Sequence, residues 1–127
     1  MSARQVVVVA LGVALLGAAG AVARFLVDRA VSARSPGGLP WGTLVVNLTG
    51  AFALGLLAGA GAGDTVALLA GTATLGSYTT FSTWMFESHR LAEDGRGRLA
   101  LLNLAVELVA GLAAATAGWA LGRWWSR

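Results

Sequence analysis

Four long apolar segments follow one another along this chain and restrict it to one class of fold. They cover residues 6–25, 40–62, 65–86 and 99–121. A helix needs about 20 apolar residues to cross a bilayer, and a continuous apolar run in lipid has to satisfy its own backbone hydrogen bonds as a helix. Only 12% of the residues are charged, against about 25% in soluble domains. We therefore expect an all-α membrane protein with a single four-helix transmembrane domain over residues 1–127.

The charged residues lie in the loops and at the ends of these segments. All nine basic residues are arginine, and the net charge is +3. This spread indicates membrane flanks rather than a nucleic-acid surface. The arginines favour the first and third loops, so the positive-inside rule weakly favours both termini outside. A bias this weak is also what a protein that inserts in both orientations needs. There is no cysteine, which excludes disulfides and thiolate metal sites.

Residues 76–83, with the sequence GSYTTFST, concentrate hydroxyl groups inside the third segment. Polar groups at membrane depth bond within the protein or line a wet path. A cluster opened by Gly76 predicts a helix that is broken at mid-membrane, where transport proteins bind ions. The alternative is that these hydroxyls bond to their own helix carbonyls or across a helix interface. The density of the cluster favours an ion or solute site.

Three further polar residues fall within the apolar segments. Arg24 either snorkels to the interface or gives positive potential to an anion entry. Asn47 either donates hydrogen bonds to an anion or pairs with another helix. Glu107, which shares a helix face with Asn103 and Gly111, costs at least about 2.5–3.5 kcal/mol at mid-membrane. It is protonated, paired with an arginine or exposed to a vestibule, and in its ionised form it would repel an anion.

Aromatic residues accompany the hydroxyl cluster. Phe81 and Trp84 are three apart on one helix face and are set around Ser82 and Thr83. Their ring edges carry partial positive charge and can face an anion, although packing against lipid or core is the simpler role.

Glycines recur at helical spacing and indicate close helix packing. The pairs are Gly17 with Gly20, Gly55 with Gly59, and Gly118 with Gly122. Small residues let membrane helices approach closely. Because a four-helix chain of this size cannot easily enclose a pore alone, we also expect an oligomer.

Three segments together give a resemblance to a known family. They are residues 17–25 (GAAGAVARF), 40–50 (PWGTLVVNLTG) and 76–83, with Glu87 beyond. The chain resembles the Fluc/CrcB family of bacterial fluoride channels. The resemblance implies passive fluoride export across the bacterial inner (plasma) membrane, with no enzyme activity. It also implies an antiparallel, dual-topology dimer with two pores along the subunit interface.

The family's functional residues map onto positions of this chain. The resemblance places Asn47, Phe81, Ser82, Thr83 and Arg24 along the fluoride path. It also implies a structural Na⁺ that is not transported, held at the dimer axis by the main-chain carbonyls that map onto Gly76 and Thr79.

Two positions depart from the family pattern. Trp84 replaces the second pore phenylalanine, and Glu107 lies where the family usually has a serine. Both suit one half of a heterodimer, so homodimer and heterodimer both stay open, with the homodimer favoured for the isolated chain. Two alternatives remain: a proton-coupled exporter resembling the small multidrug resistance proteins, using Glu107, and a non-conducting subunit of a heterodimeric fluoride channel.

Overall fold

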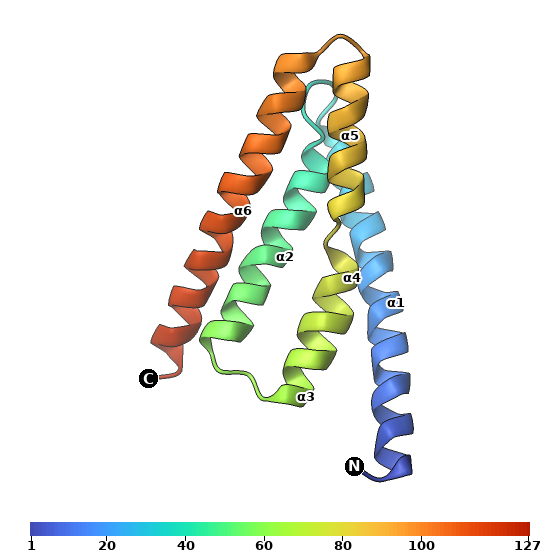
Figure 1. The fold of residues 1–127 in the computed structure, drawn as a ribbon, viewed down its shortest axis with the longest axis vertical. Helices are drawn as coiled ribbons and strands as arrows, with labels where there is room; N and C mark the ends of the chain where they lie inside the picture. Colours follow the sequence, from blue (N-terminus) through green and yellow to red (C-terminus); the bar gives the residue numbers. More distant parts are fainter.

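The computed structural model describes residues 1–127 and contains only helices and the turns between them (Figure 1). The elements are α1 (Ala3–Arg34), α2 (Trp41–Gly59), α3 (Asp64–Val66), the π-helical η1 (Ala67–Leu75), α4 (Gly76–Tyr78), α5 (Phe81–Glu93) and α6 (Gly97–Trp125). Three of these, α1, α2 and α6, are each long and apolar enough to cross a membrane. The third predicted helix is instead divided into α3, η1, α4 and α5. The expected all-helical architecture of four helical units is confirmed.

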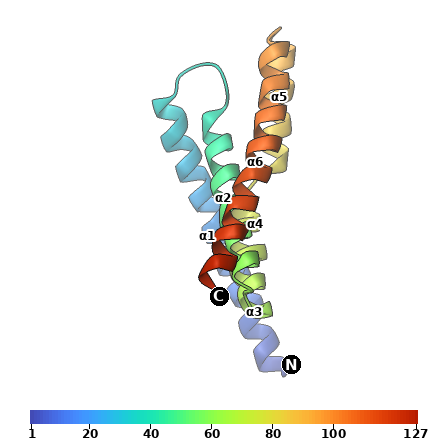
Figure 2. The same ribbon diagram turned by 90° about the vertical axis from the view of Figure 1, so that its left-hand side faces the viewer.

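The four units run alternately up and down. Both termini and α3 lie at one end of the molecule, while the α1–α2 and α5–α6 connections lie at the other (Figure 1). Seen from the side, α5 and the start of α6 lean away from α1 and α2 towards that second end (Figure 2). The turn between α2 and α3 is short, and Gly61 supplies its left-handed conformation at φ +67°.

Glycines bring α2 and α6 into backbone contact. A Cβ added at Gly55 would collide with the Ala115 carbonyl, and one added at Gly118 would collide with the Phe52 carbonyl. Gly59 and Gly122 are equally closely packed against the opposite helix. The predicted packing role of these glycines is confirmed, and their contacts fix the spacing of the two helices that flank the site described below.

Close glycine contacts also join α1 to the third helical unit, which consists of α3, η1, α4 and α5. A Cβ at Gly20 would collide with the carbonyl of Thr74 in η1, and one at Gly17 would lie 3.3 Å from Ser77 Oγ. The first helix therefore packs directly against the segment that leads into the break.

Gly118→Ala should destabilise the folded protein, because the new methyl group meets the backbone of α2 rather than a side chain that can move. Overpacking of this kind costs about 1–3 kcal/mol. The midpoint of thermal unfolding in detergent should fall accordingly. Gly111→Ala is the matched control on the same helix, since a Cβ there meets nothing within 4 Å. Equal midpoints for the two variants would contradict the close approach of α2 and α6.

The predicted break in the third helix is confirmed, but it does not lie at the glycine. Gly76 keeps helical dihedrals of φ −64° and ψ −34°. The chain becomes extended at Thr79 (φ −78°, ψ 159°) and Thr80 (φ −147°, ψ 122°). Thr80 then caps α5, because its Oγ1 accepts a hydrogen bond from the Thr83 amide at 3.2 Å. The interruption therefore depends on these two threonines and on what binds their backbone.

The segment before the break is wound more loosely than an α-helix. The Gly76 amide donates to the Gly71 carbonyl five residues earlier, and Thr74 Oγ1 donates to the Leu69 carbonyl at 2.8 Å. Such π-type turns are frequent at functional sites. In this chain the π-helical stretch leads directly into the interrupted backbone.

Candidate functional site

Asn47 holds the broken backbone in place. Its Oδ1 accepts a hydrogen bond from the Thr80 amide at 2.8 Å, and its Nδ2 donates to the Thr80 carbonyl at 2.9 Å. One side chain on α2 thereby satisfies both backbone groups of Thr80, which the interrupted helix leaves without helical partners. The extended conformation at Thr80 follows from this contact across 33 residues of sequence.

Glu107 on α6 also accepts a hydrogen bond from the side-chain amide of Asn47. Asn47 Nδ2 donates to Glu107 Oε2 at 2.8 Å, and Glu107 is only 6% exposed. Its other oxygen, Oε1, is buried and has no hydrogen-bond partner. The one acid–base contact within 4 Å joins His89 to Glu93 at 3.3 Å, so no arginine of the chain contacts Glu107. Arginine pairing, one of the roles expected from the sequence, is not found within the chain, where the partner of this carboxylate is the Asn47 amide.

A cavity of about 340 Å³ gathers half of the predicted site residues. Its polar and aromatic lining consists of Asn47, Glu107, Thr79, Thr80, Phe81 and Trp84. The two rings meet edge to face, with centroids 5.6 Å apart and planes at 87°. Phe81 is 69% exposed, so this cavity is open along the face that carries its ring.

A second cavity, of about 160 Å³, lies on the other side of the break. It is lined by Arg24, Asp28, Thr43 and Thr83, among others, and Thr80 lines both cavities. Thr83 is tied to the break, since Thr80 Oγ1 donates to Thr83 Oγ1 at 3.0 Å. Ser82 is exposed and lines neither cavity. The structure thus divides the predicted polar residues between two sides of one interrupted backbone.

Arg24 reaches the break from α1. Its Nη1 donates to the Thr79 carbonyl at 3.3 Å, and the residue is half-buried. The guanidinium therefore points into the protein rather than snorkelling to the interface, which was the simpler expectation. Its contact places positive charge beside the extended residues.

Trp84 and Asn103 fasten α5 to α6 instead of exposing donors. Trp84 Nε1 donates to the Asn103 carbonyl at 3.2 Å, and Asn103 Nδ2 donates to Ser88 Oγ at 2.9 Å. Ser88 Oγ in turn donates to the Trp84 carbonyl at 2.8 Å. The indole N–H that distinguishes Trp84 from a phenylalanine is thus already used. Sequence reasoning missed Ser88, although it lies four residues after Trp84, one helical turn away.

The main-chain oxygens at the break partly fit a cation site. The Thr80 amide, which would close the helical turn onto the Gly76 carbonyl, donates to Asn47 instead. The Thr79 carbonyl similarly lacks its helical donor, because the Thr83 amide goes to Thr80 Oγ1. It accepts from Arg24 but keeps a second lone pair. Such freed carbonyls are ligands that a hard cation prefers.

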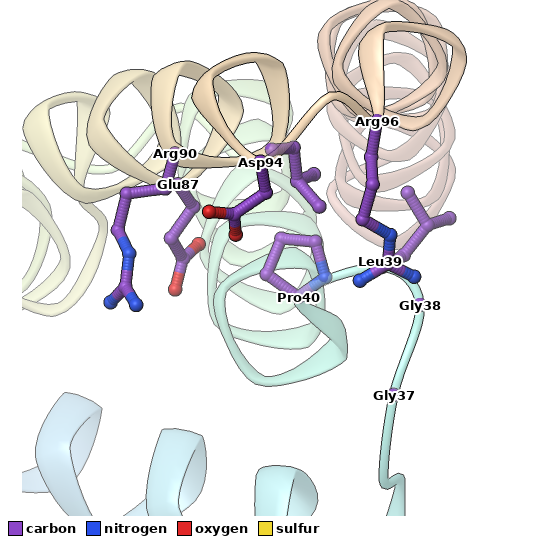
Figure 3. A pocket seen from close by; sticks show the side chains of 9 residues that line it. Gly37, Gly38, Leu39, Pro40, Glu87, Arg90, Asp94 and Arg96 are labelled. Carbon is purple, nitrogen blue, oxygen red and sulfur yellow. The ribbon is translucent and has the colours of Figure 1, made fainter.

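Thr43 lies one turn before Asn47 on α2 and was not among the predicted site residues. It is 2% exposed, and its Oγ1 has no hydrogen-bond partner. Glu87, in the middle of α5, likewise has a buried carboxylate oxygen, Oε2, without a hydrogen-bond partner. Glu87 also lines a cavity of about 240 Å³ with Arg90, Asp94 and Arg96, beside the α1–α2 loop (Figure 3). This charged cavity lies at the loop end of the molecule, away from the break.

Membrane-length apolar helices together with an interrupted third helix define a multi-pass membrane protein. The chain belongs to the CrcB family: the family model described as CrcB-like protein, Camphor Resistance (CrcB), matches residues 11–119. The relatives include the fluoride-specific ion channel FluC 2 of Mycobacterium tuberculosis, 54% identical over 90% of this chain and 87% of the relative. The fluoride-specific ion channel FluC 1 of Symbiobacterium thermophilum is 45% identical over 94% of this chain and 98% of the relative. FluC 1 of Frankia casuarinae is 46% identical over 84% of this chain and 89% of the relative.

Proposed function

We propose that this chain forms a fluoride-selective channel through which fluoride leaves the cytoplasm of a bacterial cell down its electrochemical gradient. One observation carries the proposal: in a chain 54% identical to a fluoride-specific channel, Asn47, Phe81 and an interrupted helix line one cavity. Passive conduction needs no covalent step, so the protein is an ion channel and not an enzyme.

Selectivity in this proposal comes from donors that replace the water around fluoride. Channels select ions by lining a narrow path with groups that reproduce part of the hydration shell. On one side of the break these groups are the Asn47 amide and the edge of the Phe81 ring. On the other side they are the Thr83 hydroxyl and the Arg24 guanidinium, and Ser82 adds a hydroxyl at the exposed surface.

The path requires a second subunit. Phe81, Ser82 and Gly76 are all exposed in the single chain, and only 17 of 127 residues are buried. A polar path cannot face lipid, so these groups need protein opposite them. We propose an antiparallel, dual-topology dimer, consistent with the weak arginine bias. The mass of the purified protein in detergent, corrected for bound detergent, tests this: a mass of one chain would contradict it.

A structural Na⁺ at the axis of such a dimer fits the carbonyls of Gly76 and Thr79. Two oxygens from each subunit would supply four ligands, and Na⁺ would hold the two broken helices together without being transported. Replacing NaCl by N-methylglucamine chloride should therefore lower the midpoint of thermal unfolding, because a ligand that binds only the folded state stabilises it by mass action. A midpoint that does not depend on Na⁺ would remove the ion from the proposal.

Fluoride efflux from liposomes that contain only this purified chain tests the proposed function. Rapid release of fluoride, without release of chloride, is the expected result. Absence of release from well-folded protein would leave a non-conducting subunit that needs an unlike partner. Uptake of cationic drugs that depends on pH and is lost in Glu107→Gln would instead indicate a small multidrug exporter.

A further inference from the structure

Both N–H groups of the Asn47 side chain are already occupied in this structure. One goes to the Thr80 carbonyl at 2.9 Å and the other to Glu107 Oε2 at 2.8 Å. The bond to Thr80 belongs to the backbone interruption, and the Thr80 amide bonded to Asn47 Oδ1 reinforces it. Only the bond to Glu107 can be given up without disturbing the break. An anion that reaches Asn47 therefore has to displace this carboxylate.

Glu107 is held loosely for a buried carboxylate. Its Oε1 is buried without a partner, and no basic side chain neutralises it. An unmade hydrogen bond on a buried polar atom raises the free energy of that arrangement. The single bond to Asn47 is thus the one hydrogen bond that keeps the side chain in this position.

There is room for the Glu107 side chain to move. Gly111 follows one turn later on the same face of α6, and a Cβ built there meets nothing within 4 Å. Gly111 and Glu107 line the same cavity of about 340 Å³. The helices themselves are fixed by the backbone contacts of Gly55 and Gly118, so rotation of the side chain is the available motion.

We propose that Glu107 is a tethered carboxylate gate: it occupies the Asn47 donor in the resting protein and swings over Gly111 when fluoride takes its place. This inference rests on the proposed function, since it concerns the same path. It also accounts for a carboxylate in an anion path, because the carboxylate stands where the anion would bind and leaves when the anion arrives.

Two substitutions at Glu107 test whether the side chain acts by occupying the Asn47 donor or through its negative charge. Glu107→Ser removes the acceptor and should raise fluoride efflux roughly tenfold, the effect of losing one competing hydrogen bond to a charged group. Glu107→Gln keeps an oxygen that accepts from Asn47 but loses the charge, and a neutral acceptor competes less strongly, so its efflux should rise by clearly less than in Glu107→Ser. Thr116→Ala, an exposed position on the same helix, is the control. No rise in Glu107→Ser, or an equal rise in both Glu107 variants, would overturn the gate.

A substitution at Gly111 tests the swing. Gly111→Leu fills the space beside Glu107 and should reduce efflux in the unmodified background. In the Glu107→Ser background the same change should have little effect, because no side chain has to move. An equal loss in both backgrounds would assign Gly111 to the path itself and overturn the swing.

A readout that does not depend on conduction keeps the gate separate from the proposed function. In protein labelled with ¹³C at the glutamate carboxyls, the Glu107 signal is identified by its loss in Glu107→Ser. Fluoride, but not chloride, should shift that signal. A silent efflux assay would count against the proposed function, whereas an unmoved Glu107 signal in fluoride would overturn the gate.

Discussion

Phe81→Ile should reduce fluoride efflux up to about tenfold while the purified protein stays folded. The Phe81 ring is 69% exposed, lines the cavity at Asn47 and meets Trp84 edge to face. A favourable contact at an aromatic edge is worth about 0.5–1.5 kcal/mol, and the upper value corresponds to about tenfold. Isoleucine keeps an apolar side chain on the surface of α5 but has no ring edge to offer an anion. Efflux measured with a fluoride electrode gives the size of the loss.

Phe86→Ile is the matched control for this result. Phe86 lies on the same helix and is also largely exposed, but it does not line the cavity at Asn47. Its replacement should leave efflux near that of the unmodified chain. Size-exclusion chromatography and near-ultraviolet circular dichroism of both variants show whether folding is retained. Unchanged efflux in Phe81→Ile would remove Phe81 from the fluoride path.

The features that could be predicted from the sequence are those that depend on neighbouring residues. Apolar runs of membrane length predict helices, because lipid allows few alternatives for an unbroken apolar backbone. The Gly55 and Gly118 pairs likewise indicate close packing from their spacing alone, and the structure places α2 against α6 through them. In each case the physical cause is contained within one or two helical turns.

The position of the break could not be predicted in this way. Gly76 is the local signal for an interruption, yet the helix passes through it and stops at Thr79. The cause is the side chain of Asn47, which takes both backbone groups of Thr80 from another helix. The sequence identified Asn47 as a candidate and could not show which backbone it contacts.

The hydrogen-bond partners of the polar residues could not be predicted from the sequence either. The chain separates Asn47 from Glu107 by 60 residues, and each had several possible partners. Trp84 was expected to turn a ring edge towards an anion, and the sequence could not show that the fold directs its indole N–H to the Asn103 carbonyl. Such contacts depend on how helices face one another, and a pattern within one helix does not record that.

Asn47→Asp should abolish measurable conduction and destabilise the fold. The aspartate keeps one oxygen that accepts from the Thr80 amide. Its second oxygen replaces Nδ2, which now donates to the Thr80 carbonyl at 2.9 Å and to Glu107 Oε2 at 2.8 Å. That oxygen therefore faces two acceptors and has no hydrogen to donate to either. Each buried acceptor left without a donor costs about 1–3 kcal/mol, so two of them lower a conducting population about 100-fold. Fluoride efflux and the thermal midpoint should both fall.

Glu107→Gln should partly rescue this variant, which separates a lost contact from general damage. The glutamine amide can donate to the new aspartate and restores one of the two hydrogen bonds, although it cannot restore the bond to the Thr80 carbonyl. The double variant should therefore unfold at a higher temperature than Asn47→Asp alone, while Thr116→Ala in the same background should rescue nothing. Because the two residues lie on α2 and α6, a positive coupling between them is the result expected from a direct hydrogen bond between their side chains in the folded protein. Identical midpoints for the single and double variants would mean that they do not meet there.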